Sequence, residues 1–130
     1  MSPDLTYLLY SVILCFVQVL VAAASANQQV GLPTLAGNRE GLPDIVGWAG
    51  RARRAHLNMI ENLVLFAPLV LIAAAAGKAN ATTAAGAMIF FWARLAYAVI
   101  YVIGIPWLRT LAWFVAVIGM ATIAWVLLQA

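Results

Sequence analysis

The chain has 130 residues, of which 66% are hydrophobic and only 8% are charged. Soluble domains average about 45–50% apolar and about 25% charged residues. The mean hydropathy here is +1.01, and a core of this size could not bury so many apolar side chains. An ordinary soluble domain is therefore excluded. The net charge of +3 is too small to indicate nucleic-acid binding. We therefore expect a single membrane domain over residues 1–130.

Four apolar stretches are long enough to cross a bilayer, for which a helix needs about 20 mostly apolar residues. We expect transmembrane helices over four ranges: 5–26, 44–77, 83–105 and 107–128. The predicted fold class is therefore all-α, as a bundle of four transmembrane helices.

The first apolar stretch resembles a signal peptide, because residues 22–26 look like a small-residue cleavage site. The residues before it contain Asp4 and no basic side chain, whereas signal peptides begin with positive charge. We therefore expect this helix to be retained. Cys15 lies inside it as the only cysteine, which is typical of a thiol that packs as a small hydrophobe.

Residues 27–43 contain three glycines and two prolines, which indicate a loop. Asp44 is then placed to cap the second helix. A helix of about 33 residues is about 50 Å long, whereas the hydrocarbon core is about 30 Å thick. The first turns should therefore project into water or line a wet site, and Pro68 should kink the helix within the membrane.

Positive charge is asymmetric along the chain. Lys78 is alone in the second loop, whereas five arginines lie in or beside the first and third loops: Arg39, Arg51, Arg53, Arg54 and Arg109. Basic-rich loops remain cytoplasmic. We therefore expect both termini and the Lys78 loop to be periplasmic.

A polar cluster opens the second helix, where ionisable residues within a span are functional candidates. Arg51, Arg54, Asn58 and Glu61 fall within an arc of about 80° on a helix, whereas His56 points elsewhere. One interpretation is an intrahelical pair of Arg54 and Glu61, with the other arginines marking the membrane interface. The other interpretation is a binding site, and both stay open at this point.

The third helix carries Arg94, Tyr97 and Tyr101 on one face. Arg94 lies about halfway along the span, where an arginine needs a partner, and Glu61 is the only carboxylate at comparable depth. We predict that the second and third helices face each other, within or between subunits, with Arg94 near Glu61. The two tyrosines are ligand contacts or packing residues.

Arg109 and Thr110 lie where the fourth helix begins. Arg109 is either a membrane-interface anchor or a cation that, beside the positive end of a helix, stabilises an anion such as a thiolate. His56 is the only histidine, and no residues have metal-ligand spacing. We therefore expect no metal site.

The segment from Arg54 to Asn62 is similar to the hallmark of the MAPEG family of membrane-associated proteins in eicosanoid and glutathione metabolism, an Arg-Ala-x-x-Asn-x-x-Glu pattern that opens the second helix. The resemblance covers essentially the whole chain, and the Asn38-Arg39 segment with the short third loop looks like the bacterial branch. Asn62 and Trp113 stand where relatives have tyrosines, which argues against eicosanoid synthesis.

The resemblance implies a homotrimer in the bacterial inner membrane, with glutathione bound between neighbouring subunits near the cytoplasmic face. Arg109 matches the arginine that stabilises the glutathione thiolate. The residues that we expect to bind glutathione, as co-substrate, are Arg51, Arg54, His56, Asn58, Glu61, Arg94, Tyr97, Tyr101 and Thr110.

The expected function is a detoxifying glutathione transferase that conjugates glutathione to hydrophobic electrophiles, with reduction of lipid hydroperoxides as a further activity. Arginines suit the two carboxylates of glutathione, and Glu61 suits its ammonium group. One alternative is a non-catalytic trimer that binds lipid or a partner. Another is a small multidrug transporter, although such exporters carry a carboxylate in the middle of the first helix, where this chain has only Asp4 at the end.

Overall fold

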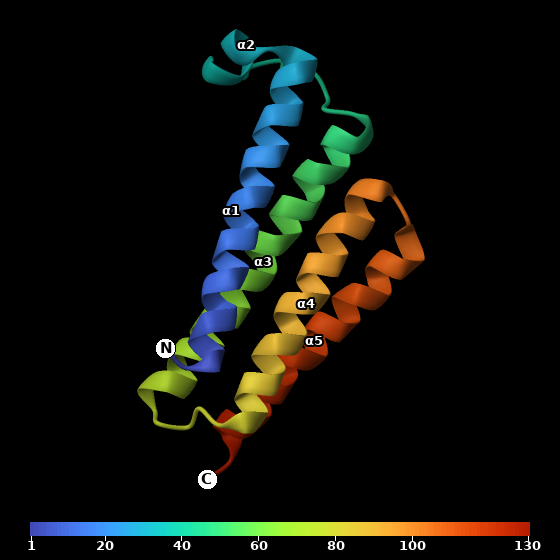
Figure 1. The fold of residues 1–130 in the computed structure, drawn as a ribbon. Helices are drawn as coiled ribbons and strands as arrows, with labels where there is room; N and C mark the ends of the chain where they lie inside the picture. Colours follow the sequence, from blue (N-terminus) through green and yellow to red (C-terminus); the bar gives the residue numbers. More distant parts are fainter.

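The computed structural model describes all residues 1–130, and its regular structure is entirely helical. Four long helices form the bundle in Figure 1, with the short α2 (Leu32–Ala36) at one end: α1 (Pro3–Val30), α3 (Gly47–Ala75), α4 (Ala81–Ile103) and α5 (Pro106–Leu128). Each long helix is apolar and long enough to span a membrane. The prediction of a bundle of four transmembrane helices is confirmed.

The start of α3 differs from the prediction, because Asp44 does not cap it. The helix begins at Gly47, and Val46 before it is extended and offers no side-chain cap. The Gln29 side chain holds both backbone groups of Val46: its Nε2 donates to the carbonyl at 2.7 Å, and its Oε1 accepts from the amide at 3.0 Å. This clamp keeps residues 44–46 out of the helix, so α3 has 29 residues and a length of about 43 Å.

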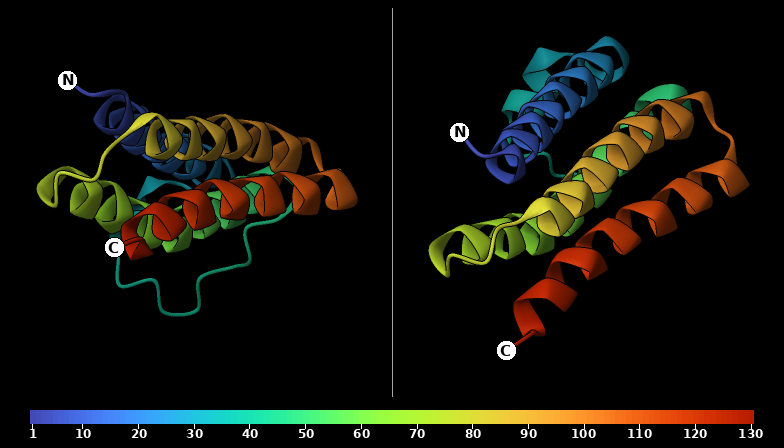
Figure 2. Two further views of the ribbon diagram at one scale, coloured as in Figure 1. Left: turned by 90° about the horizontal axis from the view of Figure 1, so that it is seen from below. Right: turned by 60° about the horizontal axis from the view of Figure 1, so that its bottom comes forward.

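The helices are arranged with α3 and α4 in the middle. α1 packs on α3 and α4, α5 packs on α4 and α3, and α1 does not touch α5. The right view of Figure 2 shows α1 and α5 on opposite sides of the α3–α4 pair. The centre of the core is an aromatic stack of Phe66 on α3 and Phe90 on α4, whose ring centroids are 3.8 Å apart.

α4 and α5 approach each other at Gly86 and Gly119. A Cβ atom added at Gly86 would lie 2.7 Å from the Gly119 carbonyl oxygen, and one added at Gly119 would lie 2.6 Å from the Gly86 carbonyl oxygen. Only glycine allows two helix backbones to come this close. The contact sets how α5 lies along α4, and therefore where its first turn lies relative to α3.

Both termini lie at the same end of the bundle as the turn between α3 and α4 (Figure 1). Lys78 in this turn donates from Nζ to the carbonyl oxygens of Leu127 at 3.1 Å and Gln129 at 2.5 Å, which caps the end of α5. The opposite end carries α2, the start of α3 and the turn between α4 and α5. The arginines of the first and third loops lie at that end: Arg39, Arg51, Arg53, Arg54 and Arg109.

Candidate functional site

A pocket of about 490 Å³ opens between α3, α4 and α5, toward the end where α4 turns into α5. Seven of the ten predicted site residues line it: Arg54, Asn58, Glu61, Tyr97, Tyr101, Arg109 and Thr110. Leu57 and Trp113 complete the lining and were not predicted as site residues. Their helical spacing could have indicated them, because Leu57 is three residues after Arg54 and Trp113 is four residues after Arg109.

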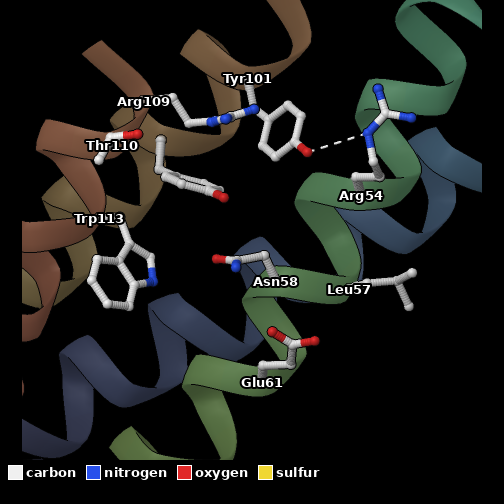
Figure 3. A pocket seen from close by; sticks show the side chains of 9 residues that line it. Arg54, Leu57, Asn58, Glu61, Tyr101, Arg109, Thr110 and Trp113 are labelled. Carbon is white, nitrogen blue, oxygen red and sulfur yellow. Dashed lines mark hydrogen bonds between the residues drawn. The ribbon is translucent and has the colours of Figure 1, made fainter. Parts of the chain in front are cut away.

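The α3 wall of the pocket is the predicted polar stripe. Asn58 and Glu61 lie across the pocket from Thr110 and Trp113 of α5 (Figure 3). Arg54 and Glu61 are exposed in the single chain, and Asn58 is half-buried. The stripe therefore presents a guanidinium, an amide and a carboxylate in that order along the helix.

Arg54 binds across to α4 rather than along its own helix. Its Nε donates a hydrogen bond to the Tyr101 hydroxyl at 3.2 Å, which Figure 3 marks with a dashed line. It makes no ion pair with Glu61, so the intrahelical pair considered from the sequence is not formed. The Glu61 carboxylate remains available to a ligand cation.

Tyr101 lies between two guanidinium groups. The guanidinium carbon of Arg109 is 4.4 Å from the centre of the Tyr101 ring, and that of Arg54 is 5.9 Å from the same centre. Cations are attracted to the face of an aromatic ring at these distances. The phenol thus holds both cations at the pocket wall, and Tyr97 packs edge-to-face on it with a centroid distance of 5.6 Å.

Arg109 and Thr110 belong to the first turns of α5. The helix begins at Pro106 after an extended Ile105 and has no side-chain cap. Its free backbone N–H groups and dipole add partial positive charge near Arg109. Thr110 donates from Oγ1 to the Pro106 carbonyl at 3.2 Å, which leaves its oxygen free to accept. With Glu61 as the only carboxylate in the lining, the pocket suits an anion that also carries one cationic group.

Arg94 does not reach the pocket. Arg94 is buried, with 1% of its surface exposed. Its guanidinium carbon lies 4.0 Å from the centre of the Tyr97 ring. None of its three guanidinium nitrogens has a hydrogen-bond partner. Contrary to the prediction, Arg94 therefore makes no ion pair with Glu61 within one chain, and its guanidinium stacks on the Tyr97 ring instead. The predicted packing of α3 against α4 is confirmed.

Arg51 and His56 also lie outside the pocket. Arg51 donates from Nε to the Val102 carbonyl at the end of α4 at 3.0 Å. His56 lines a separate pocket of about 310 Å³ between α1, the following loop and α3, together with Arg39 and Arg53. No group of three or more His, Cys, Asp and Glu side chains could hold a metal ion.

The sequence model of the MAPEG family matches residues 5–129, which include all the pocket-lining residues. Comparison with curated proteins found no match, and comparison with solved structures found none either. The family match confirms the resemblance carried by the motif of α3. It also excludes the alternative hypothesis of a small multidrug transporter. The chain is therefore a multi-pass membrane protein that belongs to the MAPEG family, a family of glutathione and eicosanoid metabolism.

Proposed function

We propose that the protein is a membrane-bound glutathione transferase, with glutathione held in the pocket between α3, α4 and α5. The observation that carries the proposal is the arrangement of Arg54 and Arg109 on either side of Tyr101, with Glu61 as the only carboxylate of the lining. Glutathione has two carboxylates, one ammonium group and one thiol. Guanidinium groups suit the carboxylates and Glu61 suits the ammonium group.

Arg109 has the catalytic role in this proposal. A free thiol has a pKa of about 8.5 and is mostly protonated at neutral pH. A guanidinium beside the start of α5 stabilises the thiolate, and the thiol proton passes to water. The thiolate then forms a carbon–sulfur bond with the electrophile, whose leaving group departs with its electron pair. Proximity and anion stabilisation suffice, and no side-chain nucleophile is needed.

The second substrate comes from the bilayer in this proposal. Leu57 and Trp113 give the pocket an apolar side next to its charged wall, which suits a hydrophobic electrophile. A lipid hydroperoxide is a further substrate: its O–O bond breaks, two glutathione molecules are oxidised to the disulfide, and an alcohol and water are released.

Assembly as a homotrimer is part of the proposal. Arg54 and Glu61 are exposed on α3, beside exposed apolar side chains such as Val64. Charged groups facing lipid are costly, so this face requires another subunit or enclosed water. His56 lies outside the pocket of its own chain, and we therefore place it at the pocket of a neighbouring subunit. Arg94 would contact glutathione only if the Tyr97 ring moved aside.

The pocket lies at the cytoplasmic face of a bacterial inner membrane in this proposal. The arginines that flank the first and third loops are at the pocket end of the bundle, whereas Lys78 is at the end with both termini. Basic-rich loops favour the cytoplasm. This orientation would be tested by placing single cysteines in the Lys78 loop and labelling them in intact cells.

The experiment that tests the function is conjugation of glutathione to an aryl halide by protein purified in detergent, together with calorimetric titration of glutathione. Wild type should bind glutathione and form the conjugate. Arg109→Ala should lower kcat by about 100-fold or more, since removing one donor to a developing anion has this effect, while native mass spectrometry still shows the trimer. Absence of glutathione binding by wild type would leave a non-catalytic member of the family.

A further inference from the structure

A second cavity lies on the other side of the bundle, in a groove between α1, α3 and α4. Its volume is about 340 Å³, and it shares no lining residue with the pocket at Arg109. Ala52 and Ala55 of α3 are almost fully buried and form its floor. Its edges are exposed valines, Val17 of α1 and Val99 of α4, so the groove opens toward the surroundings of the bundle.

The groove is apolar except at one point. Ten of its eleven lining residues are hydrophobic, and the other is Gln18. Gln18 is only 9% exposed, and its Oε1 has no hydrogen-bond partner. Buried amide oxygens are normally paired, and bulk water does not supply partners inside the hydrocarbon region. A hydrogen-bond donor is therefore needed at this position of the groove.

We infer that the groove binds a neutral, apolar molecule from the bilayer that carries one hydroxyl group, in the manner of a long-chain alcohol, with the hydroxyl donating to Gln18 Oε1. The volume falls at the lower end of the range of about 300–1,000 Å³ for ligand pockets, so the groove takes the hydroxyl end and the first part of the chain. An apolar cavity with one convergent polar group is the usual form of such a site.

The lining distinguishes this occupant from other lipids. No charged side chain lines the groove, so a carboxylate or an ammonium group would lose its hydration without a partner. A plain hydrocarbon chain would leave Gln18 Oε1 unpaired. A hydroxyl group both donates and accepts, so it pairs with the amide of Gln18 in either orientation.

Photolabelling of the purified protein in lipid nanodiscs tests the inference. Three probes share one diazirine-bearing C16 chain and end in a hydroxyl group, a methyl ether or a carboxylate. Mass spectrometry locates the labelled peptides. On wild type we expect the alcohol to label the groove residues of α1 and α4 at least fivefold more than the ether or the acid. Equal labelling by all three probes would overturn the inference.

Variants add a second test. Gln18→Leu should reduce labelling by the alcohol to the level of the ether, whereas Gln28→Leu, an exposed glutamine of the same helix outside the groove, should leave it unchanged. Val99→Trp should also reduce labelling by the alcohol, because the larger side chain would block the groove. Val99 is exposed at the edge of the groove, so the substitution should not disturb the core. Undiminished labelling of folded Gln18→Leu would contradict the inference. The comparison of probes on wild type decides the question even if a variant fails to fold, and it is independent of glutathione binding.

Discussion

The Nε of Arg51 donates a hydrogen bond to the carbonyl oxygen of Val102 at 3.0 Å and thereby ties the start of α3 to the last turn of α4. Val102 has one of the carbonyls that a helix leaves without an intrahelical partner. The turn that follows passes through Gly104 at φ +98, against the Arg51 side chain, and leads into α5. Arg51 therefore holds the turn that joins Tyr101 to Arg109.

We expect Arg51→Ala to destabilise the protein by about 0.5–1.5 kcal/mol, the net contribution of a typical hydrogen bond, because the contact between Arg51 and Val102 is half-buried. The thermal unfolding midpoint in detergent measures this loss. Arg53→Ala is the matched control, because Arg53 is exposed and makes no hydrogen bond in the structure; it should change stability by less than about 0.5 kcal/mol. Equal midpoints for the two variants would show that the contact with Val102 is dispensable.

Glu61→Gln should weaken glutathione binding specifically through the ammonium group. A hydrogen bond to a charged group contributes about 1.5–3 kcal/mol, so the Kd should rise roughly tenfold to a hundredfold. Calorimetry with N-acetylglutathione, which lacks the ammonium charge, provides the test: wild type and Glu61→Gln should bind it with equal affinity. Glu40→Gln, in the exposed loop outside the pocket, should bind glutathione as wild type does.

Thr110 and Thr122 form a matched pair on α5. Each hydroxyl donates to the carbonyl four residues earlier, at 3.2 Å to Pro106 and 2.8 Å to Ile118, but only Thr110 lines the pocket. Thr110→Val removes an acceptor beside Arg109 and should raise the KM for glutathione severalfold. Thr122→Val removes an equivalent intrahelical bond and should leave kcat and KM unchanged. A similar rise in both variants would assign the effect to the helix rather than to the pocket.

Gly119→Ala should separate α5 from α4. The new Cβ atom would lie 2.6 Å from the Gly86 carbonyl oxygen and 2.9 Å from the Phe90 amide nitrogen, both of them backbone atoms. Overpacking of this kind costs about 1–3 kcal/mol, and the shift of α5 should also lower activity, because Arg109 lies on that helix. Thermal unfolding and conjugation rates measure the two effects. Ala121→Val, exposed on the same helix, is the control and should be nearly neutral.

The amino-acid pattern alone predicts the four spans, their order and the face of α3 that carries Arg54, Asn58 and Glu61. Hydropathy and the 3.6-residue period are properties of each segment alone, so they can be read without knowing what the segment packs against. The even number of spans also places both termini at one end. The predicted pairing of α3 with α4 is correct, although the Arg94–Glu61 contact on which it rested is not formed. Arg109 and Tyr101 could be named as candidates because charged and aromatic residues stand out within or beside apolar spans.

The packing of the helices against one another, in contrast, determines which polar side chains share a pocket. Arg94 lies behind Tyr97, Arg51 binds the end of α4 and His56 lines a different pocket, although helical spacing or the family motif had grouped them with the site. The Gln29 clamp on Val46 likewise displaced the start of α3 from Asp44. Each outcome depends on side-chain directions or on distances between helices that are far apart in the chain. Those distances are set by packing such as the contact of Gly86 with Gly119, which no local pattern in the sequence specifies.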